Sequence, residues 1–489
     1  MKIAKNRVTS LYSRLIISIV VVMIASASAF RPFFITAARY NSGASAKFAT
    51  SFKEDVLNKH ALSNGSLTDK TFKKDAKLGV LFLNLGGPET VKDVEGFLYN
   101  LFADPDIIRL PICMRWLQKP LAWFIANRRA PKSSIAYQSI GGGSPIVKYT
   151  REQARLVQEA LVQRGLKQTK VYFAMRYWHP FTEEVLKEIE ADQIDSLVVV
   201  PLYPQFSVST SGSSLKLLKE VFNQQPSVWG TDKLPHTVVP AWFQRPGYVK
   251  TMAKLVLDQV VKFNQTEMQQ GLHVLFSAHG VPESYIKNGD PYQKQITECV
   301  ALVSHEVTRQ LASDKLRPRA ISAQTAKLLA QQLDKTQTCS AEQDPNKVKG
   351  ITFHLSFQSR VGPVQWLRPY TDDMLKKMGE EEKVRNLIVV PVSFVSEHIE
   401  TLEEIDMEYK ELALESGVTH WERAPALNTE PGFIQDIADL VVDALDSPTL
   451  TVAETASKGY ENKMNQQMIP GLDTSIVKSL NTTGARISL

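Results

Sequence analysis

The stretch that decides the fold reads GVLFLNLGGPET, at residues 79–90. Its first five residues form a continuous apolar run, two glycines and a proline then mark a turn, and an amphipathic segment follows at residues 91–102. A buried strand, a glycine turn and a helix in this order form a βα unit. Strands that are apolar on both faces are typical of a parallel sheet covered by helices on both sides.

The same order recurs along the chain. Further apolar runs that read as strands lie at residues 171–175, 196–202, 272–276, 351–355 and 387–395. Helical patterns follow at residues 182–190 and 399–415. The strands fall into two groups, so we predict an α/β fold with two open parallel sheets side by side. Ligands of such folds bind at the carboxyl ends of the strands, which makes residues just past strand ends the candidates for function.

Composition and charge exclude several classes of protein. The chain has 489 residues, of which 43% are hydrophobic and 22% charged, and its formal net charge is +6. This length and apolar content indicate two or three globular units rather than a disordered chain. Residues 1–74 carry a net charge of +9, whereas the remainder carries −3. A nucleic-acid-binding protein would have its basic patch in the folded part, so we expect no nucleic acid as a partner.

The N-terminal region has the pattern of a two-part targeting leader. Basic residues, a short apolar run at 15–24 and small residues up to Ala29 are typical of a signal peptide. Residues 30–74 are basic, rich in Ser, Ala and Thr, and lack acidic residues before Glu54, which is typical of a transit peptide. We predict a signal peptide at 1–29 and a transit peptide at 30–74, similar to the leaders of complex plastids, in which Phe30 would follow the cleavage site. The expected location is the plastid; a secreted protein and an uncleaved membrane anchor are the alternatives.

Two later segments are polar and lack strand periodicity. Residues 312–349 read as an insertion or mobile loop, and residues 447–489 as a polar tail without fixed structure.

Two glycine motifs are open to two interpretations each. Gly86 and Gly87 follow a strand and could cradle a phosphate, although Pro88 removes one amide and a tight turn explains them as well. Three glycines before Ser144 allow either a mobile turn or the close approach of the backbone to a flat ligand.

The cysteines do not suggest a metal site. Cys113, Cys299 and Cys339 lie too far apart for a CxxC zinc site, iron–sulfur spacing or a disulfide framework to be recognised. Any metal chemistry must therefore use histidines and carboxylates.

A histidine follows one of the predicted strands. His279 lies in SAHGVP, at residues 277–282, directly after the run at 272–276. A single histidine is often a structural residue, but a strand end in an α/β fold is also where a catalytic histidine would lie.

An acidic row follows another strand. Glu400, Glu404 and Glu408 recur every four residues, so a helix would stack their carboxylates on one face, where they repel one another. A solvated acidic face would explain this pattern. However, the row begins beside His398, and no Lys or Arg lies between Glu397 and Glu408 to compensate the charge. Such a row suits the passage of a divalent cation or of protons.

At this point the chain resembles the ferrochelatase family. The motifs that carry the resemblance lie at residues 84–90, 141–146, 175–180, 203–207, 277–292, 358–366 and 396–402. The resemblance extends over residues 78–445. It implies two doubly wound, Rossmann-like lobes with parallel four-stranded sheets and a central cleft, a chelatase-like fold with lobes at 75–240 and 241–446. It also implies insertion of ferrous iron into protoporphyrin IX to give protoheme, with iron as a substrate and no prosthetic group.

Carried over residue by residue, the resemblance assigns roles in this sequence. His279 and Glu400 would be the catalytic pair, and the metal would meet His279, Glu400, His398, Glu404 and Glu408. Substrate binding would involve Arg176 and Tyr177 near the metal-entry side, Trp366 against the macrocycle, and Ser144, Arg128 and Arg129 near the porphyrin rim. For Arg128 and Arg129, a solvated pair of arginines is the alternative.

The sequence departs from some relatives at the ligands of an iron–sulfur cluster. Val208 stands where animal-type members have a cluster cysteine, and no cysteine follows Cys339. We therefore expect no cluster. Peripheral membrane contact, if it occurs, would use the apolar residues 110–124, which include Trp116 and Trp123.

Three rival functions remain at this stage. A His–Glu site of this kind does not by itself exclude another metal or another tetrapyrrole. A non-catalytic porphyrin or heme carrier could use the same cleft. A phosphate or nucleotide binder would use Gly86 and Gly87 instead.

Overall fold

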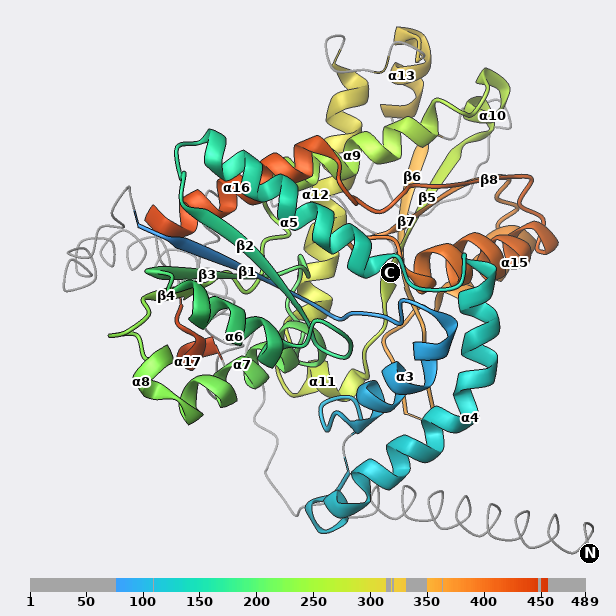
Figure 1. Ribbon diagram of the computed structural model, residues 1–489. Helices are drawn as coiled ribbons and strands as arrows, with labels where there is room; N and C mark the ends of the chain where they lie inside the picture. The colour runs from blue at the N-terminus through green and yellow to red at the C-terminus, as the bar shows by residue number, and fades with distance from the viewer. Residues whose placement is uncertain are drawn as a thin grey trace, which may run out of the picture. The chain divides into compact units, whose positions relative to one another are not determined.

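The computed structural model describes residues 76–455, except for 109, 314–317, 319–320, 331–349, 363 and 447–449. The predicted signal and transit peptides lie outside the described residues. Two four-stranded sheets form the frame, and all of their strands are parallel (Figure 1). The α/β prediction is therefore confirmed.

Each sheet repeats the same strand order. The first sheet has the order β2-β1-β3-β4 and the second has β6-β5-β7-β8. The strands are β1 (Leu78–Asn84), β2 (Thr169–Met175), β3 (Ser196–Pro201), β4 (His236–Val238), β5 (Leu272–His279), β6 (Ile351–Gln358), β7 (Asn386–Pro391) and β8 (His420–Arg423). In both sheets the order changes direction beside the first strand. The gap between the carboxyl ends at this point is the usual ligand site of such folds.

Helices connect the strands and cover the sheets. The longer ones are α3 (Val94–Ala103), α4 (Gln118–Ser139), α5 (Ile146–Gln163), α6 (Thr182–Asp192), α7 (Ser213–Gln224), α9 (Pro246–Val260), α12 (Tyr292–Ala312) and α16 (Pro431–Asp446). The shorter ones are α8 (Pro226–Trp229), α10 (Gln265–Gln270), α11 (Glu283–Lys287), α13 (Ala323–Ala330), α14 (Thr371–Lys376), α15 (Lys410–Glu415) and α17 (Val452–Thr455). Two 3-10 helices, η1 (Val91–Asp93) and η2 (Ile112–Leu117), and three π-helices, η3 (Val208–Gly212), η4 (Lys377–Glu381) and η5 (Glu400–Tyr409), complete the set.

Strand β5 of the second sheet is largely apolar because both of its faces are buried. Val274 and Phe276 of β5 belong to the main core, whereas Leu275 between them packs into a second core. That second core contains Ile405 and Tyr409 of η5. Neighbouring residues of one strand thus face different layers, which explains the continuous apolar run.

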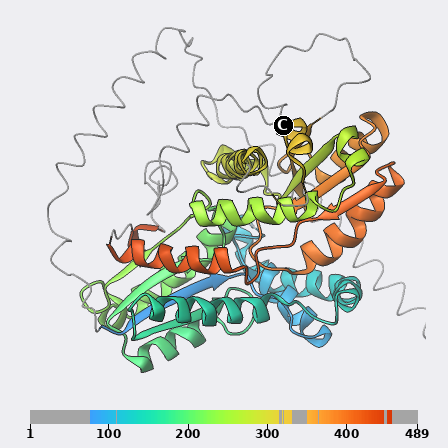
Figure 2. The ribbon, with the colours of Figure 1, turned by 90° about the horizontal axis from the view of Figure 1, so that it is seen from above.

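One layer of helices joins the two sheets. Helices α12, α9, α16 and α5 lie side by side in that order (Figure 2). The main core runs without a break through residues of both sheets and of these four helices. The two halves are therefore packed together by apolar contacts rather than linked only by the chain.

Several sequence-based boundaries differ from the structure. The strand expected at 387–395 ends at Pro391, and the short edge strands β4 and β8 were not expected from the apolar runs. Part of the predicted insertion is helix α13, which packs against α12 and α10, while residues 331–349 lie outside the described residues. The predicted tail also begins too early. Leu450 is 5% exposed and pairs with Val238, so residues 450–455 belong to the folded part, and 456–489 are not described.

Glycine geometry explains the two glycine motifs. Gly86 has φ +86°, and a Cβ on Gly87 would lie 2.7 Å from the Cβ of Ser144. A Cβ on Gly143 would lie 2.0 Å from the carbonyl oxygen of Glu89. Close packing of the turn against a neighbouring loop accounts for Gly86, Gly87 and Gly143, whereas Gly141 and Gly142 have φ +107° and +96° and open space around them.

Candidate active site

His279 is the last residue of β5, at the point where the strand order of the second sheet changes direction. Its amide donates a hydrogen bond to Ser393 Oγ at 3.0 Å, and its carbonyl accepts one from Tyr292 Oη at 2.8 Å. Tyr292 Oη is also 2.8 Å from Ser393 Oγ. The segment after β7 and the start of α12 therefore fix the backbone of His279, while its side chain stays 34% exposed.

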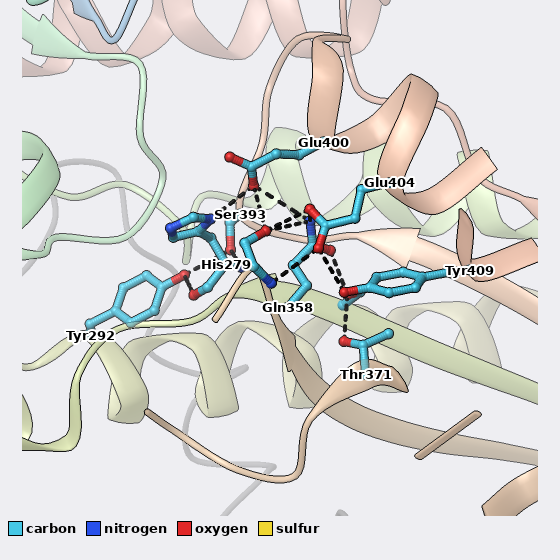
Figure 3. A network of polar contacts seen from close by, with 10 residues as sticks. His279, Tyr292, Gln358, Thr371, Ser393, Glu400, Glu404 and Tyr409 are labelled. Atoms are coloured by element: carbon cyan, nitrogen blue, oxygen red, sulfur yellow. Dashed lines mark hydrogen bonds and ion pairs between the residues drawn. The ribbon is translucent and has the colours of Figure 1, made fainter. Parts of the chain in front are cut away.

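The side chain of His279 is paired with a carboxylate. Its Nδ1 atom lies 2.8 Å from Oε2 of Glu400 at the start of η5 (Figure 3). Burial lowers the pKa of His279, but the charge and hydrogen bond of Glu400, with a further contribution from Glu404, outweigh burial and raise it above its usual value. Burial likewise raises the pKa of Glu400, and the charge and hydrogen bond of His279 outweigh it, so that the pKa falls to about 2. The pair is thus stabilised in its ionic form.

A second carboxylate continues from this pair. Ser359 Oγ is 3.2 Å from Oε2 of Glu400 and 2.7 Å from Oε2 of Glu404, and the Ser359 amide donates to Glu404 Oε1 at 3.1 Å (Figure 3). Tyr409 Oη donates to the same Oε1 at 2.7 Å. Burial and the negative charge of Glu400 raise the pKa of Glu404 to about 7, against the hydrogen bonds of Ser359 and Tyr409.

The helix that carries the row is not the α-helix that the spacing predicted. Residues Glu400–Tyr409 form the π-helix η5, and α15 begins only at Lys410. π-Helices are rare and are frequently found at functional sites. Glu408 is exposed near the end of η5, where a cavity of about 330 Å³ lies beside Glu404, Glu408 and Asp372. The row therefore leads from His279 to a cavity.

His398 lies close to the pair but outside its hydrogen bonds. It is buried, its ring packs 4.2 Å from that of Phe394, and its Nδ1 atom is buried without a hydrogen-bond partner. Burial lowers its pKa. No three of the His, Cys, Asp and Glu side chains in the described residues form a set that could hold a metal ion. The five predicted metal-contacting residues therefore do not form one coordination shell in the described part of the chain.

Among the predicted substrate-binding residues, Trp366 lies near His279, whereas Arg176 and Tyr177 are held by another residue. The Trp366 ring lies 6.4 Å from that of His279 at 79°. Arg176 and Tyr177 share a different partner, because Arg176 Nη2 and Tyr177 Oη both donate to Asp104 Oδ2 at 2.8 Å. Burial raises the pKa of Tyr177, as does the charge of Asp104.

In the described part of the chain, none of the three predicted rim residues forms a hydrogen bond or ion pair with His279 or Glu400. Ser144 is buried, and its amide donates to Pro88 O at 2.7 Å. Arg128 and Arg129 are exposed on α4, and the guanidinium of Arg129 lies over the ring of Phe102. Nevertheless, the same helix carries Tyr137, whose pKa is raised by burial and by the charge of Glu400. Helix α4 therefore borders the site.

Several residues of this site were missed by sequence reasoning. They are Tyr137, Tyr292, Ser359, Ser393, Tyr409 and Arg423, the last of which pairs with Glu397 and Asp406 of the acidic segment. Ser359 could have been found, because it directly follows β6 as His279 ends β5. The other five are brought to the site by packing between distant segments, and no local pattern marks them.

The fold and the paired residues define a class of protein. This is an α/β protein with a histidine–carboxylate centre at the carboxyl end of a parallel strand, followed by a line of acidic residues suited to a cation or to protons. The family model named Ferrochelatase matches residues 77–445. The chain belongs to the ferrochelatase family.

Individual relatives agree with this result. The chain is 47% identical over 401 residues to ferrochelatase-2, chloroplastic, of Arabidopsis thaliana. The aligned residues cover 82% of this chain and 70% of the relative. It is 49% identical over 384 residues to the protein of the same name from Cucumis sativus, covering 78% and 66%. It is 48% identical over 375 residues to a ferrochelatase of Trichodesmium erythraeum, covering 76% and 84%. The chain thus spans about two thirds of the length of the plant relatives.

Proposed function

We propose that this chain inserts ferrous iron into protoporphyrin IX and releases two protons, which gives protoheme in the last step of heme biosynthesis. It acts as a lyase, as the family does. The observation that carries the proposal is the 2.8 Å contact between His279 Nδ1 and Glu400 Oε2 at the end of β5. Replacing two pyrrole protons with one dication requires a proton acceptor and a path for the cation. Glu404 beside the pair, with its pKa raised to about 7, can accept protons, and the acidic line provides the path.

The two members of the pair have different tasks. The imidazole of His279 and the carboxylate of Glu400 face the macrocycle centre, where pyrrole protons leave and iron enters. Glu404 and Glu408 extend the path for cations and protons toward the cavity beside them. His398 supports the pair from its buried position next to Glu400.

The macrocycle lies against Trp366, close to His279. The edge-on contact of the two rings, 6.4 Å apart, supports this placement. Arg176 and Tyr177 border the side from which the metal enters, held there by Asp104. Ser144, Arg128 and Arg129 line the rim, where guanidinium groups can pair with propionates. Support for the rim comes from α4, which carries both arginines and also Tyr137.

The protein works without an iron–sulfur cluster. Val208 packs against the main core, and its amide donates to Asp290 Oδ2 at 2.9 Å, so the position is used for packing. Analysis of iron and sulfide in the purified chain tests this, and about two of each per chain would contradict it.

The site of action is the plastid. The chloroplastic names of the plant relatives support this location, as does the leader pattern of residues 1–74. Within the described residues, no helix has the length and apolar character needed to cross a bilayer. Peripheral contact with a plastid membrane uses the exposed side chains of Ile112, Trp116 and Trp123 on η2 and α4. Sedimentation with lipid vesicles, with and without Trp116→Ala and Trp123→Ala, measures this contact.

The decisive experiment is anaerobic incubation of the purified chain with ferrous iron and protoporphyrin IX, followed by absorbance of the product. Glu400→Gln and His279→Ala should each lose more than about tenfold in rate, a change of 1.4 kcal/mol or more, while porphyrin binding is retained. Glu411→Gln is the matched control, because Glu411 is an exposed glutamate of α15 outside the row. Porphyrin binding without any metal insertion by the wild-type chain would indicate the carrier instead. Faster insertion of another divalent metal would indicate a different chelatase.

A further inference from the structure

The acidic segment at the site carries more negative charge than its own residues can balance. Between Glu397 and Glu408 the chain has six carboxylates and no Lys or Arg. Like charges on neighbouring turns destabilise a helix, and more strongly when they are buried. A cation from elsewhere in the chain must therefore help to hold this segment in place.

That cation comes from the edge of the second sheet. Arg423 ends β8, and its side chain is only 12% exposed. Its Nη1 donates to Glu397 Oε1 at 2.9 Å, and its Nε donates to Asp406 Oδ1 at 2.7 Å. Glu397 Oε1 also accepts the amide of Ala426 at 2.9 Å. One guanidinium thus joins two carboxylates that lie nine residues apart.

The two carboxylates lie at the ends of the stretch 397–406, which contains His398, Glu400 and Glu404. Glu397 directly precedes His398, and Asp406 follows Glu404 by two residues. Glu400 and Glu404 have other partners, namely His279, Ser359 and Tyr409. Because a guanidinium is planar and rigid, it sets the separation of the two ends without neutralising the glutamates between them.

We propose that Arg423 is a positioning residue that holds Glu397 and Asp406 on either side of the site glutamates, so that Glu400 and Glu404 stay aligned with His279 while their charge remains available to the incoming dication. This rests on the roles of His279 and Glu400 given under the proposed function. Arg423 acts on ferrous iron through the segment and does not touch the porphyrin.

The chain offers a matched control. Arg245 is also a buried arginine that joins two carboxylates, with Nε 3.1 Å from Asp436 Oδ1 and Nη1 2.8 Å from Asp443 Oδ2. Both of these aspartates belong to α16 rather than to the acidic segment. Arg245→Gln therefore removes a buried guanidinium that joins two carboxylates, but it leaves the acidic segment intact.

The test compares Arg423→Gln, Arg423→Lys and Arg245→Gln in the full chain. The measurements are the thermal midpoint, kcat, and separate KM values for ferrous iron and protoporphyrin IX. Arg423→Gln should lower kcat/KM for iron by about tenfold or more and change KM for the porphyrin less than about threefold. Arg423→Lys should recover part of the loss, because lysine keeps the positive charge but lacks the planar guanidinium that binds two carboxylates at once. Arg245→Gln should lower the thermal midpoint without changing the iron dependence.

A fourth variant keeps the test decisive if Arg423→Gln does not fold. Asp406→Asn leaves Arg423 paired with Glu397 only, and it should also lower kcat/KM for iron. Equal losses for iron and porphyrin in the Arg423 variants, or the same kinetic pattern in Arg245→Gln, would overturn the proposal. If Glu400→Gln is inactive and the Arg423 variants behave as wild type, only this inference fails. If the wild-type chain inserts no iron, the proposed function itself fails.

Discussion

Glu400 and Glu404 lie four residues apart, and their pKa values are shifted in opposite directions because their partners differ. The histidine beside Glu400 more than offsets the effect of burial, and the pKa falls to about 2. Burial and the negative charge of Glu400 raise the pKa of Glu404 to about 7, because they outweigh the hydrogen bonds of Ser359 and Tyr409 and the weaker effect of the more distant His279. A proton released near His279 is therefore held more tightly at Glu404 than at Glu400, which favours movement along the row.

The raised pKa of Glu404 predicts how stability depends on pH. Glu404 has a pKa of about 7 in the folded protein and 4.5 in the unfolded chain. Its ionisation therefore lowers the free energy of unfolding at every pH at which the unfolded chain has lost this proton more completely than the folded protein. The cost is absent below pH 4.5, grows as pH rises to 7, and is complete above 7. Glu404→Gln should therefore gain stability relative to wild type by roughly 1 to 3 kcal/mol between pH 4.5 and pH 8. Urea unfolding at the two pH values checks this, and a pH-independent difference would contradict it.

Ser359 is the residue that joins the two glutamates. It has φ +63°, a conformation that a serine rarely adopts, and its single hydroxyl lies between the two carboxylates. Ser359→Gly should relieve the backbone and keep the protein at least as stable, yet lower kcat by about tenfold, since a hydrogen bond to a charged group contributes about 1.5 to 3 kcal/mol.

The control for Ser359 is another serine that serves a buried carboxylate. Ser207 Oγ donates to Asp290 Oδ2 at 2.9 Å, and neither residue belongs to the acidic row. Ser207→Gly should cost stability without a specific loss of metal insertion. Full activity of Ser359→Gly in the steady-state assay would show that the hydroxyl is dispensable.

At the level of elements, η5 is held by its apolar side. Ile405 is 0% exposed in the second core, between the sheet and α14, whereas Met407 is 46% exposed on the same helix. The widened turns of a π-helix leave its internal hydrogen bonds less favourable than those of an α-helix, so this packing is needed to keep the acidic residues in place.

The packing of η5 can be tested with two substitutions on one helix. Ile405→Ala should lower the free energy of unfolding by about 2 to 5 kcal/mol, because it leaves a cavity in a closed core. Met407→Ala should change it by less than about 0.5 kcal/mol, because its side chain is largely in water. Denaturant unfolding gives both values, and similar losses for the two variants would mean that η5 does not depend on the core.

At the level of the whole molecule, the helix layer joins the two sheets, and a buried amide of α5 adds a polar connection between the two halves of the chain. Gln153 of α5 belongs to the first half of the chain, and its Nε2 donates to Asn428 O at 2.7 Å and to Ser396 Oγ at 3.0 Å. Ser396 lies two residues before His398. The first half therefore helps to place the segment that enters the active site.

Gln153→Leu should loosen this connection. We expect a loss of about 1 to 3 kcal/mol in the free energy of unfolding, because buried acceptors in the second half lose their donor, together with slower metal insertion. Gln158→Leu is the control on the same helix, since Gln158 accepts the amide of Val171 within the first half. Stability curves and initial rates measure both effects. An equal loss of activity in Gln158→Leu would show that general weakening of α5 is responsible.

The sequence by itself determined the α/β class, six of the eight strands and the positions of His279 and of the acidic row. These features have local causes, because a strand buried on both faces must be apolar and a functional side chain follows its end. The edge strands β4 and β8 were not predicted, because both are short. In addition, β8 has the sequence HWER, which contains no apolar run.

Only the tertiary structure decided which side chains meet. The 2.8 Å contact between His279 and Glu400 joins residues 121 positions apart, and Arg423 reaches Asp406 across 17. The π-helical turns of η5 could not be predicted from the sequence either, because glutamates spaced four residues apart are equally compatible with an α-helix. Such contacts depend on how sheets, helices and loops pack, and packing is a property of the whole core rather than of any local pattern.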